Sequence, residues 1–150
     1  MPLIEMSAPA GSVPDENKPA LQEDLAAAVL DAMDLPKSEF FRSATRVYLS
    51  MFSAENTGTG SGGAGSGFTV TVTALSGFLD AEKNEALAGR LTGIVLGAAG
   101  LDPSHAASVW TVVHEIPEGN WAVGGGITRR AVIDTHAAAA RSQLRPAGSR

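Results

Sequence analysis

The first residue that could do chemistry is the proline at position 2, in the opening stretch Met-Pro-Leu-Ile-Glu. Proline fixes φ and donates no hydrogen bond, and a β-strand tolerates both properties at its first residue. A second interpretation exists, because aminopeptidases commonly remove a Met that precedes proline. Pro2 would then carry a free secondary amine, and in an apolar pocket this amine would be a base near neutral pH. A retained Met1 would remove this possibility, so the intact mass distinguishes the two interpretations.

Three further side chains are candidates for a site that handles a small acid. Glu115, at the end of an expected strand, could orient substrate or activate water, although a carboxylate there is commonly solvated or paired. His114 directly precedes it, so the two side chains should point to opposite faces of the strand. Arg46 offers a planar fork that suits a carboxylate, or else a surface or intersubunit ion pair.

Two other patterns are excluded as cofactor sites. The glycine-rich stretch at 58–67 fits G-x-G-x-x-G twice, but a strand is expected after it instead of a helix, and no Lys-Ser or Lys-Thr pair follows. It is therefore interpreted as a flexible joint and not as a nucleotide-binding loop. The three histidines lack metal-ligand spacing and there is no cysteine, so neither a metal site nor a disulfide is expected.

Charge and hydropathy narrow the class of protein. The net charge of −5 disfavours nucleic acid as a partner, since no basic patch is evident. No apolar run reaches about 18 residues, and the amino-terminal end lacks the pattern of a signal peptide. We therefore expect a cytoplasmic protein that does not associate with membranes, with a sizeable core because 44% of its residues are hydrophobic.

The elements that must position these residues form the same pattern twice. Alternation and helical spacing predict a strand, a helix and a strand in each half, at 3–7, 18–33 and 44–53 and again at 68–75, 80–99 and 108–116. A glycine hairpin is expected at 117–126, then an Ala-rich helix and a disordered tail within 131–150. Lys18 aligns with Lys83 and Arg46 with Trp110, which indicates an internal repeat of roughly 65 residues. On that offset Pro2 falls opposite Gly67.

Two β-α-β units predict an α+β fold with a four-stranded mixed sheet and both helices on one face. The units should span 2–57 and 68–126 of a single domain that ends near residue 130. The other face of the sheet would be bare although its strands carry apolar residues, so oligomerisation is expected to cover it.

These features together resemble the tautomerase superfamily, which includes 4-oxalocrotonate tautomerase, macrophage migration inhibitory factor and the cis-3-chloroacrylic acid dehalogenases. The resemblance rests on Pro2 after Met1, on the two units in one chain, and on the segment "VWTVVHEIPEGNWAVGGG" at 109–126. It covers about residues 2–130. It implies a homotrimer, no cofactor or metal, and an amino-terminal proline that acts as general base and acid.

Some residues depart from the family pattern, and these departures bear on which substrate the site would bind. Arginines that clamp substrate carboxylates in several members are replaced here by Val13, Leu75 and Phe78, and a dehalogenase histidine by Met33. Dehalogenation is therefore put in doubt. Glu115 matches a dehalogenase glutamate, and Trp121 matches an aromatic residue that lines the pocket of oxalocrotonate-type enzymes.

The resulting expectation is a tautomerase that interconverts the enol and keto forms of a small, hydrophobic 2-oxo acid such as a phenylenolpyruvate-like compound. Pro2 would be the base, and the expected substrate-binding residues are Arg46, Leu75, Phe78, His114 and Trp121. Arg129 and Arg130 are candidates to replace the lost clamp. Two alternatives stay open: a hydratase or decarboxylase in which Glu115 positions water, and a noncatalytic trimer with the same fold.

Overall fold

The first half of the chain folds as a β-α-β unit, as predicted. In this computed structural model, which describes residues 1–144, the unit consists of β1 (Leu3–Pro9), α1 (Lys18–Ala32) and β2 (Arg46–Phe52). Proline 19 lies in the first turn of α1, where its missing N–H has no helical partner to lose. A short helix that was not predicted, α2 (Glu39–Ser43), precedes β2, and the Ser38 hydroxyl caps it by accepting a hydrogen bond from Phe41 N at 3.5 Å.

The second half repeats the arrangement with β3 (Phe68–Leu75), α3 (Ala81–Ala99) and β4 (Val109–Ile116). The Asp80 side chain caps α3, because its Oδ1 accepts a hydrogen bond from Lys83 N at 2.8 Å. Gly100 ends the helix in the left-handed conformation, with φ of 67°. Short 3-10 helices at Asp15–Asn17, Ala54–Asn56 and Pro103–Ser108 complete the connections.

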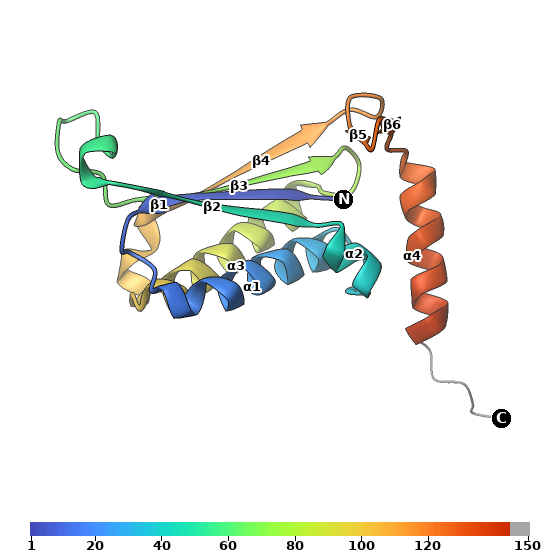
Figure 1. Ribbon diagram of the computed structural model, residues 1–150, viewed down its shortest axis with the longest axis horizontal. Helices are drawn as coiled ribbons and strands as arrows, with labels where there is room; N and C mark the ends of the chain where they lie inside the picture. The colour runs from blue at the N-terminus through green and yellow to red at the C-terminus, as the bar shows by residue number, and fades with distance from the viewer. Residues whose placement is uncertain (145–150) are drawn as a thin grey trace.

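The four strands form one mixed sheet in the order β2-β1-β3-β4. β1 and β2 are parallel, β3 and β4 are parallel, and the two units meet where β1 and β3 run antiparallel. α1 and α3 lie on the same face of this sheet (Figure 1). The expected α+β architecture is therefore confirmed.

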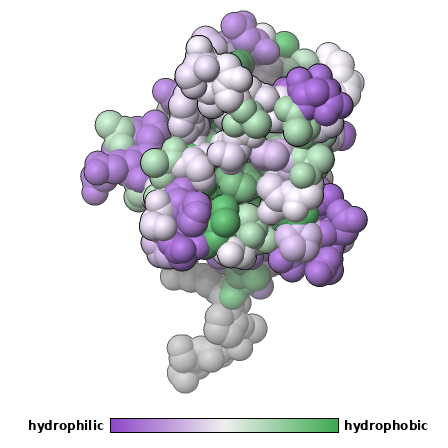
Figure 2. Space-filling model, turned by 90° about the vertical axis from the view of Figure 1, so that its left-hand side faces the viewer, coloured by the Kyte–Doolittle hydropathy of each residue, from purple (hydrophilic) through white to green (hydrophobic). Residues whose placement is uncertain are grey.

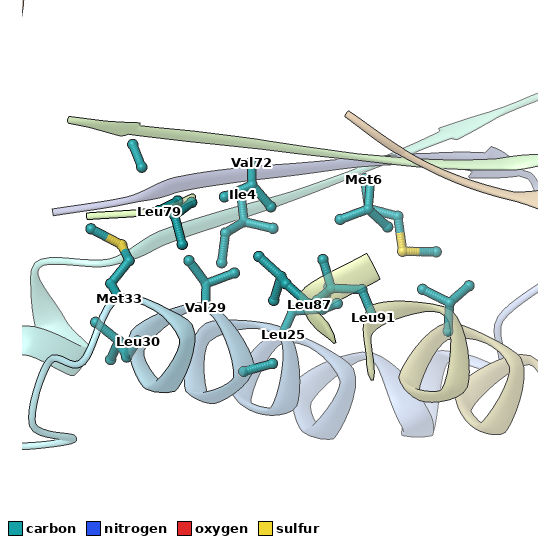
Figure 3. Packing of buried hydrophobic residues seen from close by; sticks show 14 of the residues in the cluster. Ile4, Met6, Leu25, Val29, Leu30, Met33, Val72, Leu79, Leu87 and Leu91 are labelled. Carbon is teal, nitrogen blue, oxygen red and sulfur yellow. The ribbon is translucent and has the colours of Figure 1, made fainter. Parts of the chain in front are cut away.

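The hydrophobic core fills the space between the sheet and the two helices. Alternate residues of the central strands, including Ile4, Met6 and Val72, point towards the helices and are fully buried. Figure 3 shows them packed against Leu25 of α1 and Leu87 of α3. Removal of this apolar surface from water stabilises the fold. Because the buried residues of β1 pack between the sheet and the helices, this packing also holds β1 in place.

The opposite face of the sheet is open and carries large apolar side chains. Trp110 is 69% exposed, Tyr48 is 50% exposed, and Phe52 and Val112 are also exposed. All four lie on alternate positions of the two edge strands, β2 and β4. This pattern matches the sequence expectation that one face lacks a covering layer.

The glycine-rich segment 58–67 joins the units at the end of the sheet where β3 begins. It forms no regular element apart from a bridge between Gly58 and Ala64. A groove of about 560 Å³ lies beside it, lined by the segment, by the end of β2 and by Phe68 and Trp110. Figure 2 views this end of the molecule, where apolar residues near the centre are surrounded by polar ones.

The chain continues into the predicted hairpin, β5 (Ala122–Val123) and β6 (Gly126–Ile127), and then α4 (Arg130–Leu144). α4 stands at the end of the sheet where β1 begins, beside α2 (Figure 1). It packs through Ile133, Ala137 and Ala140, which are buried. The tail expected to be disordered lies outside the described residues. No helix within residues 1–144 is both long enough and apolar enough to cross a membrane.

Candidate active site

Pro2 lies buried immediately before β1, at the edge of the core. Its carbonyl oxygen accepts a hydrogen bond from Arg46 N at 3.3 Å, which ties it to the start of β2. On the other side Leu3 pairs with Thr73, so Pro2 comes next to Ala74 near the end of β3. The position of Pro2 is thus determined by both neighbours of β1.

A cavity of about 240 Å³ reaches the amino-terminal end of the chain. Met1 forms part of its wall, and the rest comes from α2, the β5–β6 hairpin and α4. Burial lowers the pKa of the Met1 amino group from its ordinary value of 8.0, because the charged form loses hydration there. A base at this end of β1 would therefore be neutral at a lower pH than an exposed amine.

Glu115 occupies the same row of the sheet as Pro2. Ala74 pairs with Glu115, so the Cα atoms of Pro2 and Glu115 are separated by two strand spacings, or about 10 Å. Glu115 Oε1 accepts a hydrogen bond from Gly77 N at 3.3 Å. The carboxylate is exposed and is held beside the loop that leads into α3.

Arg46 and His114 lie on the open face of the sheet, away from this row. Both belong to the next row, which runs from Arg46 through Leu3 and Thr73 to His114, so they are about three strand spacings apart. Arg46 Nη1 donates a hydrogen bond to the Tyr48 hydroxyl at 3.4 Å. Arg46 contacts Pro2 through its backbone N–H, but the side chains of Arg46 and His114 lie on the face opposite to that of Pro2 and Glu115.

The remaining predicted site residues are largely core residues. Leu75 and Phe78 are 1% and 5% exposed, and Val13 is also buried. The guanidinium of Arg130 lies over the Phe78 ring, 4.4 Å from its centroid. Trp121 is partly buried against the core, and its carbonyl oxygen accepts a hydrogen bond from Thr128 N at 2.8 Å, which closes the hairpin.

A second, polar cavity of about 200 Å³ lies on the other side of α4, and sequence reasoning missed it. Its charged lining residues come from α3, α4 and the loop after α1 and are Asp34, Lys83, Arg130, Asp134 and Arg141. Lys83 Nζ contacts Asp34 Oδ2 at 2.5 Å, and Arg141 donates a hydrogen bond to the Asp34 carbonyl oxygen. These cations are thus engaged in holding α4 and α3 to the end of α1. No local sequence pattern predicts contacts between residues this far apart.

Arg129 and Arg130 are adjacent in sequence but face different cavities. Arg129 lines the cavity that contains Met1, and its Nη1 lies 3.5 Å from Glu118 Oε1. Arg130 lines the polar cavity, donates a hydrogen bond to the Gly77 carbonyl oxygen and lies 3.6 Å from Asp134. Of the two arginines, only Arg129 therefore lines the cavity at the start of β1.

Solved structures with a similar fold include fused 4-OT proteins, a member of the cis-3-chloroacrylic acid dehalogenase family and a macrophage migration inhibitory factor-like protein. A fused 4-OT, a symmetric trimer, has a TM-score of 0.72 at 22% identity, covering 87% of this chain and 98% of its own. A protein inactivated by 2-oxo-3-pentynoate has a TM-score of 0.71 at 22% identity, and the match covers 87% of this chain and 98% of that protein. N1, a member of the cis-3-chloroacrylic acid dehalogenase family, gives 0.70 at 22%, covering 89% and 88%. No family model and no curated protein matches the sequence. The chain therefore has the fused, two-unit tautomerase fold, as the sequence predicted.

Proposed function

We propose that this protein is a cofactor-independent tautomerase that interconverts the enol and keto forms of a small, hydrophobic 2-oxo acid. After removal of Met1, the neutral Pro2 amine accepts the enol hydroxyl proton. The resulting ammonium group then gives a proton to the neighbouring carbon, so the net change is an isomerisation. The observation that carries the proposal is the cavity at the amino-terminal end, because its wall includes Met1, the residue bonded to the Pro2 nitrogen.

Two further observations support this role for Pro2. Burial lowers the pKa of the Met1 amino group, and the same surroundings would lower the pKa of a free Pro2 amine; a base that titrates near the working pH is the most effective one. The same fold occurs in a protein inactivated by 2-oxo-3-pentynoate, which is itself a 2-oxo acid.

The proposal also includes assembly into a homotrimer, supported by the exposed apolar side chains on the open face and by the trimeric fused 4-OT.

The test is ketonisation of phenylenolpyruvate by protein whose amino terminus is verified by mass. Insertion of one Ala between Met1 and Pro2 converts the Pro2 nitrogen to an amide while keeping every side chain. This variant should lose about 10²- to 10⁴-fold in kcat/KM, the usual contribution of a general base. Pro2→Ala retains a terminal primary amine and should lose less. Pro14→Ala, an exposed proline substitution, should behave as wild type.

The pH dependence gives a second readout of the same base. Only the neutral amine accepts a proton, so kcat/KM should rise with pH and level off once the Pro2 amine is deprotonated. Burial at this end of the chain, which lowers the pKa of the Met1 amino group, should bring that plateau to a lower pH than an exposed proline amine would give. Undiminished turnover in the Ala-insertion variant would contradict the role of Pro2. Absence of turnover in wild type with a verified Pro2 terminus would favour the noncatalytic alternative.

A hydratase or decarboxylase is the second candidate, because Glu115 shares a sheet row with Pro2 and the hydrogen bond from Gly77 N holds its carboxylate. In this case Glu115 would position water for attack on an unsaturated acid, or assist decarboxylation of a 3-oxo acid. Glu115→Gln should then abolish turnover of such substrates. Simple tautomerisation should survive this substitution, which separates the two candidates.

A further inference from the structure

We propose that α4 forms, within the same chain, a specificity pocket that binds the aryl group of the substrate, with Arg129 at its rim binding the substrate carboxylate. This inference rests on the proposed function and gives that site its substrate class, an aryl 2-oxo acid. The pocket is the cavity between α2, the β5–β6 hairpin and α4 described above.

The location of the cavity links it to the reacting atom. Met1 is part of its wall, and the peptide bond of Met1 ends on the Pro2 nitrogen. Removal of Met1 would therefore extend the cavity towards the free amine of Pro2. A ligand that fills the cavity would have its inner end at the base.

The lining of the cavity suits an aromatic ring. Its wall includes the apolar side chains of Phe40, Val123, Ile127, Val132 and Ile133. The ring of His136 stacks on Phe40 with centroids 4.4 Å apart and an interplanar angle of 21°, so a flat aromatic surface is already formed there. The volume of about 240 Å³ exceeds the roughly 150 Å³ in which an apolar cavity takes up benzene.

The charge at the rim suits a carboxylate. Arg129 is the cation that lines this cavity, and Glu118, its partner at 3.5 Å, is itself exposed. A solvent-exposed ion pair of this kind contributes little, so a substrate carboxylate can take the place of Glu118. The planar guanidinium can then bind both carboxylate oxygens. Arg130 is not available for this role because it faces the polar cavity behind α4.

The test is equilibrium binding of phenylpyruvate and of pyruvate, measured by NMR titration on the full chain. Val132→Trp places a large ring in the cavity from a position that is 53% exposed, so folding should be unaffected. It should weaken phenylpyruvate binding at least tenfold and leave pyruvate binding unchanged. Ile127→Trp fills the cavity from the opposite wall and should give the same result if Val132→Trp does not fold.

Arg129→Gln should weaken both ligands by about 10- to 100-fold, as expected for loss of hydrogen bonds to a charged group. Arg90→Gln is the matched control, since Arg90 is a half-exposed arginine of α3 that pairs with Asp31 and does not line this cavity, and it should leave both affinities unchanged. Absence of phenylpyruvate binding by wild type, unchanged binding in both Trp variants, or equal effects of the two Arg variants would overturn the proposal.

Binding and turnover separate this proposal from the proposed function. The Ala-insertion variant has no free Pro2 amine but keeps the cavity, so the same Trp and Arg substitutions can be compared in it. The pocket proposal fails if those substitutions leave phenylpyruvate binding unchanged, even in an enzyme whose turnover requires Pro2. The proposed function fails if turnover is unaffected by blocking the amine, whatever binds in the cavity.

Discussion

Gly77 is the residue at which the loop after β3 meets the C-terminal helix. Its N–H donates to Glu115 Oε1, and its carbonyl oxygen accepts from Arg130. Its φ of 91° lies in a region that residues with a Cβ rarely adopt. A Cβ at this position would also meet the Arg130 guanidinium. One glycine therefore determines how a predicted site residue and α4 are held.

Gly77→Ala should lower the free energy of unfolding by about 1–2 kcal/mol, because alanine is strained at positive φ and displaces Arg130. Gly89→Ala is the matched control, and it is expected to change the free energy of unfolding in the opposite direction. Gly89 is an exposed glycine inside α3 with open space around it, so alanine there should stabilise by up to about 1 kcal/mol. Urea unfolding measures the free energy of unfolding of the two variants. Equal changes in the two variants would contradict the argument that alanine is strained at position 77.

α4 is the element whose packing decides the shape of both cavities. Its buried stripe, Ile133, Ala137 and Ala140, faces the rest of the chain, and the two cavities lie on either side of it. Arg130 near its start and Arg141 near its end both donate to backbone carbonyl oxygens of other elements. The helix is therefore docked along its length by one apolar stripe and two polar contacts.

Ile133→Ala should weaken this docking by about 2–5 kcal/mol, the usual range for removing a buried Ile side chain to Cβ. The expected result is faster amide hydrogen exchange throughout α4, with unchanged protection in α1 and α3. Val132→Ala changes the neighbouring, half-exposed position and should shift stability by less than about 0.5 kcal/mol. Unchanged exchange in α4 for Ile133→Ala would show that the helix is held by its polar contacts alone.

The regular elements could be predicted because their information is local. The alternation in 68–75 gives β3 with the observed bounds, and Asp80 marks the start of α3. α2 was missed because five residues are too few to show a helical period. The two cavities were missed because they depend on where α4 docks, through contacts such as Arg141 to Asp34 that join residues 107 positions apart. Likewise, the sequence identified Pro2 as a candidate base but did not indicate that α2, the hairpin and α4 would form a cavity beside it.

At the scale of the whole molecule, the open face of the sheet still lacks a covering layer within residues 1–144 of one chain. Its exposed aromatic residues, Tyr48, Phe52 and Trp110, lie on the edge strands β2 and β4. Apolar side chains gathered on one sheet face are a property of proteins that associate. The open face therefore supports the proposed trimer more directly than any feature of the helices does.

Trp110→Glu should convert the proposed trimer to a monomer, because it places a charge where two apolar faces would meet. Light scattering should then report a mass near 15.3 kDa instead of about three times that value. Leu144→Glu is the control, since Leu144 is similarly exposed at 66% but lies at the end of α4, and its mass should stay that of wild type. A wild-type mass near 15.3 kDa would refute the trimer.

The antiparallel pairing of β1 with β3 relates the two units by an approximate twofold axis through the middle of the sheet. Leu3 pairs with Arg46, and Thr69 pairs with Trp110. With Arg46 aligned on Trp110, as the repeat predicts, Leu3 corresponds to Thr69 and Pro2 to Phe68, one residue from the Gly67 given by the offset of the two lysines. The groove beside Phe68 is thus the symmetry mate of the cavity at Met1. At that end the backbone runs on through the glycine-rich segment, so the nitrogen is an amide and cannot be a base. A break in the backbone just before Phe68 would create a second amino terminus at the twofold-related position.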